Sequence, residues 1–129
     1  MCLSNGFIYD PHTCFCYTYL STQYRYNESV IARAAMNADL AKIERGLKQL
    51  IIETFLDTVN DTQVRIQGEW DNSTGIWKYR DGSEIQYFNW NTNQPTMGVS
   101  DIYIIINKNH WHDYSLFKQF AAICEMTNL

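Results

Sequence analysis

The chain has 129 residues, of which 46% are hydrophobic and 15% aromatic, so it is long enough for one folded domain and too apolar for a disordered segment. Its formal net charge is −4 and its ten Lys and Arg residues are scattered, which excludes the clustered positive charge that nucleic-acid binding needs. The longest apolar runs, such as IYIII at 102–106, suit a buried strand and are far shorter than a transmembrane span. We therefore expect a single domain over residues 1–129 and no nucleic-acid partner.

The first half of the chain predicts a hairpin followed by two helices. Asp10-Pro11-His12-Thr13 is a turn sequence, and the residues after it alternate as they would in a strand, which places a hairpin within residues 1–20. A first helix is expected to begin at an N-cap, Asn27. Its predicted buried face comprises Val30, Ile31, Ala34 and Ala35. A second helix is predicted over 43–56, where side chains recur at helical spacing: Ile43, Leu47, Leu50, Ile51, Thr54 and Phe55.

After Asn60 the pattern changes to short strands separated by polar loops. Strands are predicted at 64–66, 77–79, 102–106 and 121–124. Helices first and strands later indicate an α+β fold. The polar stretch at 81–101 has little periodicity, and so long a loop in a compact domain is usually functional. Glu69 and Asp71 are interpreted as residues of a solvated turn.

Cysteines and glycosylation sequons favour an oxidising, extracellular setting. There are four cysteines, Cys2, Cys14, Cys16 and Cys124, and three sequons, which begin at Asn27, Asn60 and Asn72. MCLSNGFIYD has neither the charged start nor the apolar stretch of a signal peptide. We therefore expect a secreted or cell-surface ectodomain whose leader or membrane tether lies outside these residues. A zinc site formed by Cys2, His12, Cys14 and Cys16 is an alternative, but its spacing matches no standard zinc module and disulfides are favoured.

A resemblance to a known family rests on seven short segments that occur in order along nearly the whole chain. They are ADLAKI after the first helix, IQG at 66–68, IWKYRDGS at 76–83, YFNW at 87–90, QP at 94–95, WHD at 111–113 and AAICE at 121–125. In this order and spacing they resemble a C-type lectin-like domain. The resemblance implies two helices that flank two small antiparallel sheets, with a long loop region that carries the ligand site and with residues 1–20 as the N-terminal hairpin of the long form.

Sugar-binding members of this family hold Ca²⁺ with a Glu-Pro-Asn or Gln-Pro-Asp motif, a later acidic residue and a Trp-Asn-Asp motif. The corresponding residues here are Gln94-Pro95-Thr96, then Ser100 or Asp101, then Trp111-His112-Asp113. Ca²⁺ takes six to eight oxygen ligands and binds more tightly as carboxylates are added, so one secure carboxylate, two short hydroxyls and an imidazole are too few. We therefore favour no metal and no cofactor. If Ca²⁺ does bind, its expected ligands are Gln94, Asp101 and Asp113, and a zinc site at His110, His112 and Asp113 is disfavoured because adjacent loop histidines are common without metal.

The resemblance also implies a changed disulfide pattern. The loop bridge of the family falls at Ile102 and Leu116, and the helix partner of Cys124 falls near Arg33. The family comparison favours Cys2–Cys16 with Cys14–Cys124, ahead of Cys2–Cys14 with Cys16–Cys124. One bridge with two unpaired thiols remains an alternative.

The expected function follows from these substitutions. We found no catalytic Ser/His/Asp or Cys/His grouping, so the chain is not expected to be an enzyme. The hypothesis is an extracellular recognition module that binds a protein or glycoconjugate without calcium. Its candidate contact residues are Gln94, Thr96, Ser100, Asp101, His112, Asp113 and Tyr114. The alternatives are a calcium-dependent lectin with a weak rearranged site and a paralogue that keeps only the fold. Trp77, Trp90 and Trp111 are expected to pack in the interior, whereas Trp70, Tyr87, Tyr103 and Tyr114 are expected to be available for contacts.

Overall fold

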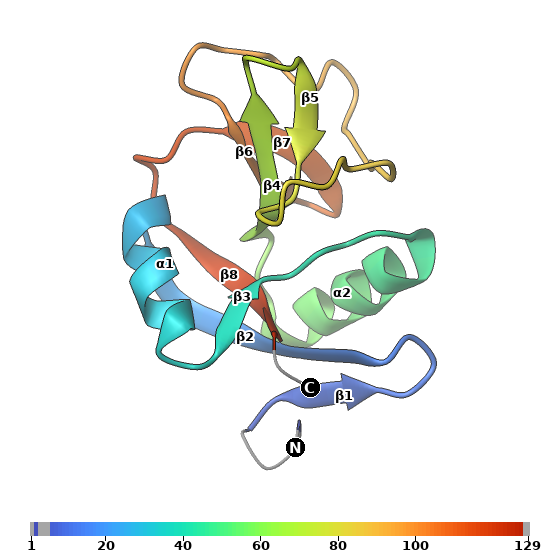
Figure 1. The fold of residues 1–129 in the computed structure, drawn as a ribbon. Helices are drawn as coiled ribbons and strands as arrows, with labels where there is room; N and C mark the ends of the chain where they lie inside the picture. The colour runs from blue at the N-terminus through green and yellow to red at the C-terminus, as the bar shows by residue number, and fades with distance from the viewer. Residues whose placement is uncertain (1, 3–5, 128–129) are drawn as a thin grey trace.

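The computed structural model describes Cys2 and residues 6–127, so residues 1 and 3–5 of the expected hairpin and residues 128–129 lie outside it. The elements are β1 (Ile8–Asp10), β2 (Phe15–Tyr24), α1 (Tyr26–Ala34), β3 (Ala38–Leu40), α2 (Gly46–Val59), β4 (Gln63–Asp71), β5 (Ile76–Lys78), β6 (Tyr103–Asn107), β7 (His110–Tyr114) and β8 (Phe120–Met126). Two helices beside a mostly antiparallel sheet make this an α+β fold, which confirms the expected class (Figure 1). Neither described helix is long and apolar enough to cross a membrane.

The strands form a single sheet with the order β1-β2-β8-β4-β6-β7, while β3 pairs with β8 and β5 pairs with β4. The two small sheets expected from the family correspond to two antiparallel groups, β1-β2-β8-β3 and β5-β4-β6-β7. They are joined by a short parallel contact in which Val64 pairs with Ala121 and Arg65 with Ala122. Figure 1 shows the two helices on either side of the first group and the β4–β7 group above them, with the loop region around its upper end.

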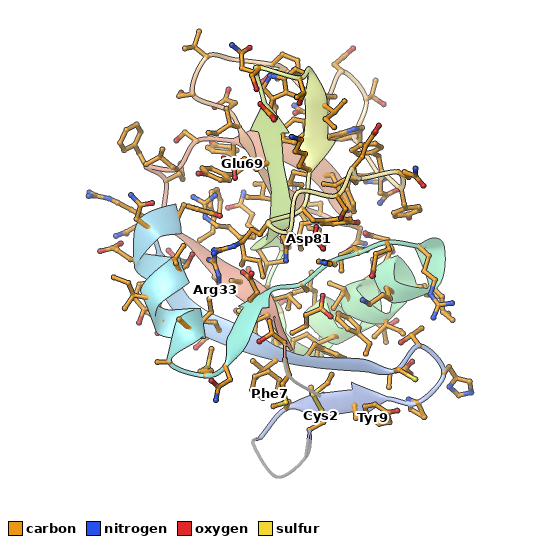
Figure 2. All side chains as sticks on the ribbon, in the orientation of Figure 1. Cys2, Phe7, Tyr9, Arg33, Glu69 and Asp81 are labelled. Carbon is orange, nitrogen blue, oxygen red and sulfur yellow. A yellow bond between two sulfur atoms is a disulfide. The ribbon has the colours of Figure 1, made fainter. Side chains whose placement is uncertain are left out.

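The predicted hairpin forms, with Ile8 opposite Tyr17 and Asp10 opposite Phe15. Asp10 closes its turn, because the backbone N–H and the hydroxyl of Thr13 both donate to its carboxylate, at 2.9 and 2.7 Å. Further along β2, Thr18 pairs with Cys124 of β8, so the hairpin is attached to the last strand of the chain. Cys2 and Phe7 lie beside β1, at the end of the molecule farthest from the loop region (Figure 2).

The first helix starts two residues earlier than predicted, and its buried face is different. Its N-cap is Arg25, whose backbone N–H donates to Glu28 at 2.9 Å, so Asn27 lies inside the first turn and is not the cap. Ile31 is 75% exposed, whereas Ser29 and Arg33 are buried. Ser29 and Arg33 are buried because they are hydrogen-bonded: Arg33 donates to the Ser29 hydroxyl at 2.8 Å and to Asp39 at 2.8 Å. Burial here follows hydrogen bonding rather than side-chain hydrophobicity.

The second helix also presents a different face from the predicted one. It runs from Gly46 to Val59 and ends at Asn60, which has the left-handed conformation with φ 55° that suits a C-terminal cap. Leu50 is 57% exposed, while Gln49 is buried because the indole N–H of Trp111 donates to its side-chain oxygen at 2.8 Å. This hydrogen bond ties α2 to β7.

The main core lies between α2 and the sheet. It contains the inward side chains of β2, β4, β6 and β8, together with aromatic residues from the loop region. Trp77 and Trp111 are buried in it, and Trp90 packs between them with ring centroids 5.3 and 6.0 Å away. Trp70 and Tyr87, which were expected to be available for contacts, are half-buried against the same core.

Candidate functional site

Asp113 is the centre of a hydrogen-bonded network that joins the loop region to β7. Its side chain points inward from the strand and is only 4% exposed. One carboxylate oxygen accepts from the N–H and the hydroxyl of Thr96, both at 2.8 Å, and the other accepts from the N–H of Met97 at 2.7 Å. The backbone N–H of Asp113 in turn donates to the side-chain oxygen of Gln94 at 3.3 Å. A buried carboxylate with three donors is well satisfied, so it can hold the segment 94–97 against the strand.

The tip of the loop beyond this network is open to solvent and partly apolar. Met97 is 43% exposed and Val99 fully exposed. Met97 has φ 59°, a left-handed conformation that non-glycine residues seldom adopt, and its N–H bond to Asp113 helps to hold it there. Asp101 is linked to the network through the Thr96 hydroxyl at 3.4 Å, and Ser100 is exposed. The loop therefore displays two apolar side chains on a base fixed by Asp113.

His112 and Tyr114 lie on the other face of β7, because alternate residues of a strand point in opposite directions. The His112 ring nitrogen Nε2 lies 3.3 Å from the Asn91 amide nitrogen, and partial burial lowers the pKa of His112. The Tyr114 ring packs edge-on against Phe120 at 5.2 Å between centroids. Of the predicted contact residues, Gln94, Thr96, Asp101 and Asp113 come together, and His112 and Tyr114 do not join them. The strand over 110–114 was not predicted from the sequence, and Trp111 and Asp113 point inward from it.

The hydrogen-bonding pattern around Asp113 does not suit a calcium ion. Both carboxylate oxygens already accept N–H or O–H groups, which compete with a cation for the same oxygens. A second carboxylate, that of Asp101, is connected to Asp113 only through the Thr96 hydroxyl. Ca²⁺ needs six to eight oxygen ligands, several of them carboxylates. Within Cys2 and residues 6–127, no three His, Cys, Asp or Glu side chains are grouped in a way that could hold a metal.

The cysteines form one bridge, and the predicted second bridge is wrong. Cys2 and Cys16 are joined, with Cα atoms 5.8 Å apart, so they cannot belong to the alternative zinc site. Cys14 and Cys124 are both unpaired. The partner of Cys124 across the strands is Thr18, and Cys14 lies four residues before it, about 13 Å along an extended strand. A disulfide requires Cα atoms within about 7 Å, so the relocated bridge is out of reach.

The three sequon asparagines are all exposed. Asn27 lies in the first turn of α1, Asn60 caps α2 and Asn72 lies in the turn between β4 and β5. Their positions leave each side chain accessible to a modifying enzyme, and glycosylation stays a prediction.

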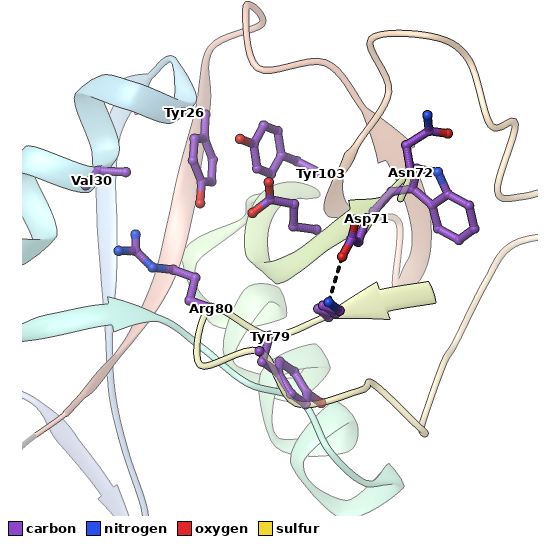
Figure 3. Close-up of a pocket in the computed structure, with 11 residues that line it drawn as sticks. Tyr26, Val30, Asp71, Asn72, Tyr79, Arg80 and Tyr103 are labelled. Carbon is purple, nitrogen blue, oxygen red and sulfur yellow. Dashed lines mark hydrogen bonds and ion pairs between the residues drawn. The ribbon is translucent and has the colours of Figure 1, made fainter. Parts of the chain in front are cut away.

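A pocket that sequence reasoning missed lies between α1 and the β4–β5 hairpin (Figure 3). It has a volume of about 580 Å³. Its lining includes Tyr26, Glu69, Trp70, Asp71, Arg80 and Tyr103. Glu69 and Asp71 were interpreted as solvated turn residues, but they end β4 and face this pocket. The alternation of side chains along β4 predicts that Glu69 and Asp71 lie on one side of the strand. The sequence alone does not show that α1 packs opposite them, because that depends on tertiary packing.

No protein-family model and no curated protein sequence matches this chain. Solved structures do resemble it. A calcium-independent type II antifreeze protein superposes with a TM-score of 0.80 over 93% of this chain and 90% of that one, at 21% identity. SPL-1 in complex with GlcNAc gives 0.80 over 93% and 91%, at 20% identity. The carbohydrate-recognition domain of the mouse scavenger receptor C-type lectin gives 0.76 over 85% and 86%, at 22% identity. The chain therefore has the fold of the C-type lectin-like domains, which confirms the expectation from its sequence motifs.

Proposed function

We propose that this chain is a non-enzymatic, extracellular recognition module that binds a protein or glycoconjugate ligand without calcium. The observation that carries the proposal is the Asp113 network. Thr96 and Met97 supply to its carboxylate the three hydrogen bonds that take the place of an ion. The loop is thereby organised by the protein's own donors, so its shape does not depend on a metal.

The contact surface in this proposal is the tip of the loop, residues 97–101. Exposed apolar side chains that are held in a fixed backbone conformation favour contact with another protein surface, because they bury apolar area with little loss of backbone entropy. Met97 and Val99 have this exposure, and Met97 is fixed by its bond to Asp113. The superposition with a structure named as a calcium-independent antifreeze protein supports a stable fold of this kind without the ion.

The alternative is a lectin with a weak calcium site at Gln94, Asp101 and Asp113. It is supported by the proximity of these residues: the Thr96 hydroxyl contacts Asp101 and Asp113, and the Gln94 side-chain oxygen accepts from the Asp113 backbone N–H. Calorimetry with Ca²⁺, together with thermal unfolding in Ca²⁺ and in EGTA, separates the two functions. We expect no heat of binding and the same melting temperature in both solutions. A submillimolar affinity that disappears in Asp113→Asn and in Asp101→Asn would establish the alternative.

The contact surface is tested separately by an array of extracellular proteins probed with a tetramer of this chain in EGTA. The double variant Met97→Ser, Val99→Ser should lose the interactions that the wild type makes. Leu50→Ser is the matched control, because Leu50 is a 57% exposed apolar residue on α2, away from the loop. Equal loss in both variants, or loss in neither, would show that the loop tip is not the contact surface.

A further inference from the structure

The pocket between α1 and the β4–β5 hairpin has walls of opposite charge. Figure 3 shows Tyr26 and Val30 on the α1 side, with Arg80 extending toward them, and Asp71 and Asn72 across the pocket. Glu69, a residue of β4, also lines the pocket. With a volume of about 580 Å³, the pocket falls within the usual size range of small-molecule sites.

The ion pairs within the pocket leave two groups available to a ligand. Lys78 is paired with Asp71 at 2.6 Å, and the Arg80 Nε is paired with Asp39 at 3.2 Å. The terminal nitrogens of Arg80 make no hydrogen bond, and the Glu69 carboxylate makes neither a hydrogen bond nor an ion pair, within the residues that the structure describes. Glu69 and Arg80 are not paired with each other there, so a ligand can lie between an available carboxylate and an available guanidinium edge.

Two buried arginines behind Tyr26 extend the charge separation. The guanidinium carbons of Arg33 and Arg65 lie 5.2 and 5.8 Å from the centre of the Tyr26 ring. Arg33 is paired with Asp39, whereas Arg65 makes no ion pair among the described residues. The Tyr26 side of the pocket is therefore net positive, with Arg33 from α1 and Arg65 from β4, and Glu69 makes the opposite side negative, since Lys78 neutralises Asp71.

The charged groups on both sides of the pocket affect the pKa of the Tyr103 hydroxyl. Burial is the main cause that raises the pKa of Tyr103 to about 12, and the charges of Tyr26 and Glu69 raise it further, while those of Arg65 and Arg33 lower it. The ring of Tyr103 stacks on that of Tyr26 with centroids 3.7 Å apart, so this stacked pair forms a rigid aromatic floor between the two walls.

We infer that this pocket binds a small zwitterion, with the cationic group of the ligand on Glu69 and the anionic group on the terminal nitrogens of Arg80. A ligand with only one charge would satisfy one wall and leave the other charge desolvated. A free amino acid is the simplest ligand with both groups. Trp70, at the pocket edge, offers an apolar surface to its side chain. This site is separate from the loop tip, so the inference does not depend on the proposed function.

The test uses four related probes followed by ¹H–¹⁵N chemical shifts: L-phenylalanine, N-acetyl-L-phenylalanine, L-phenylalaninamide and N-acetyl-L-phenylalaninamide. The first has both charges, the next two have one each, and the last has none. We expect shifts at the Trp70 indole and an affinity for L-phenylalanine about tenfold higher than for either singly charged probe, as loss of one charge-assisted contact predicts.

The variants assign each charge to its residue. Glu69→Gln should bind L-phenylalanine and N-acetyl-L-phenylalanine equally, and Arg80→Gln should bind L-phenylalanine and L-phenylalaninamide equally. Asp39 keeps its bond to Arg33 in the second variant, so folding is preserved. Asp57→Asn and Lys108→Gln change exposed charges elsewhere and should leave all affinities unchanged. The inference is overturned if no probe shifts the pocket resonances, if the uncharged probe binds as tightly as L-phenylalanine, or if both pocket variants keep the wild-type discrimination.

Discussion

Replacing Thr96 with valine should weaken the attachment of the loop region to β7. Valine has nearly the same shape but a methyl group in place of the hydroxyl that donates to Asp113 at 2.8 Å. The backbone bonds from Thr96 and Met97 remain. A hydrogen bond to a charged group contributes about 1.5–3 kcal/mol to the free energy of unfolding. Asp113 is 4% exposed, so water has little access to replace the lost donor. Because Thr96 itself is at the surface, we expect the lower end of that range, about 1.5 kcal/mol.

Urea unfolding of the wild type, Thr96→Val and Thr96→Ser measures the effect. Serine keeps the hydroxyl and is the matched control. For a chain of this length, 1.5 kcal/mol corresponds to a fall in melting temperature of about 4–9 °C. Hydrogen exchange at the Met97 amide provides a local readout, because this N–H donates to the same carboxylate at 2.7 Å. Its exchange should be faster in the valine variant and unchanged in the serine variant.

A different outcome is that the valine and serine variants have the same free energy of unfolding and the same Met97 exchange rate. That result would mean that the Thr96 hydroxyl is not a significant partner of Asp113. The carboxylate would then be held by backbone donors alone, and the oxygen that Thr96 contacts would be more accessible to a cation than the structure indicates.

Three further predictions concern other parts of the fold. A thiol reagent should label Cys14 in the native protein and Cys124 only after unfolding. The reason is that Cys14 is exposed, whereas burial raises the pKa of Cys124 to about 12. Intact-mass measurement of the native protein should show one label, and two labels would contradict the prediction. Burial first, then its bond to Asp61, raises the pKa of Tyr19 to about 12. Its contribution to stability should be complete below pH 10 and lost as the pH rises from 10 to 12, so Tyr19→Phe should flatten the fall of stability in that range. Gly68→Ala should reduce the free energy of unfolding by about 1–3 kcal/mol, because the added Cβ would overlap the side chain of Ile104, and an unchanged urea midpoint would contradict this.

The sequence predicted β4, β5, β6 and β8 because their apolar runs are short, buried and bounded by polar loops, but it did not predict β3 or β7. It failed on the buried faces of both helices for a common reason. Ser29, Arg33 and Gln49 are buried because each bonds to a particular partner, and two of those partners, Asp39 and Trp111, lie outside the helix concerned. A hydrophobic pattern ranks side chains by apolarity and contains no information on which polar groups will meet.

The candidate site shows the same limit. The family motif made Asp113 a candidate calcium ligand and contact residue, which stays a prediction, but it gave no sign of the hydrogen bonds that Asp113 makes. In the structure it accepts hydrogen bonds from the loop, and two of the three donors are backbone N–H groups, which no substitution in a motif records. The pocket beside Glu69 was missed because its walls come from α1 and from β4, which are far apart in the sequence.

The position where the family places the cysteine partner of Cys124 shows how the frame is kept without that bridge. Arg33 occupies it, and this side chain is buried and donates to Asp39 at 2.8 Å. Asp39 lies on β3, where it pairs with Glu125 of β8, the residue next to Cys124. The tie that a disulfide would make directly between the first helix and the last strand is thus made in two steps, an ion pair from α1 to β3 and a backbone pairing from β3 to β8. Removing one partner of a buried ion pair costs about 3–5 kcal/mol because the other charge is left unpaired, so this connection depends on both Arg33 and Asp39. It also leaves the Cys124 thiol unpaired and buried.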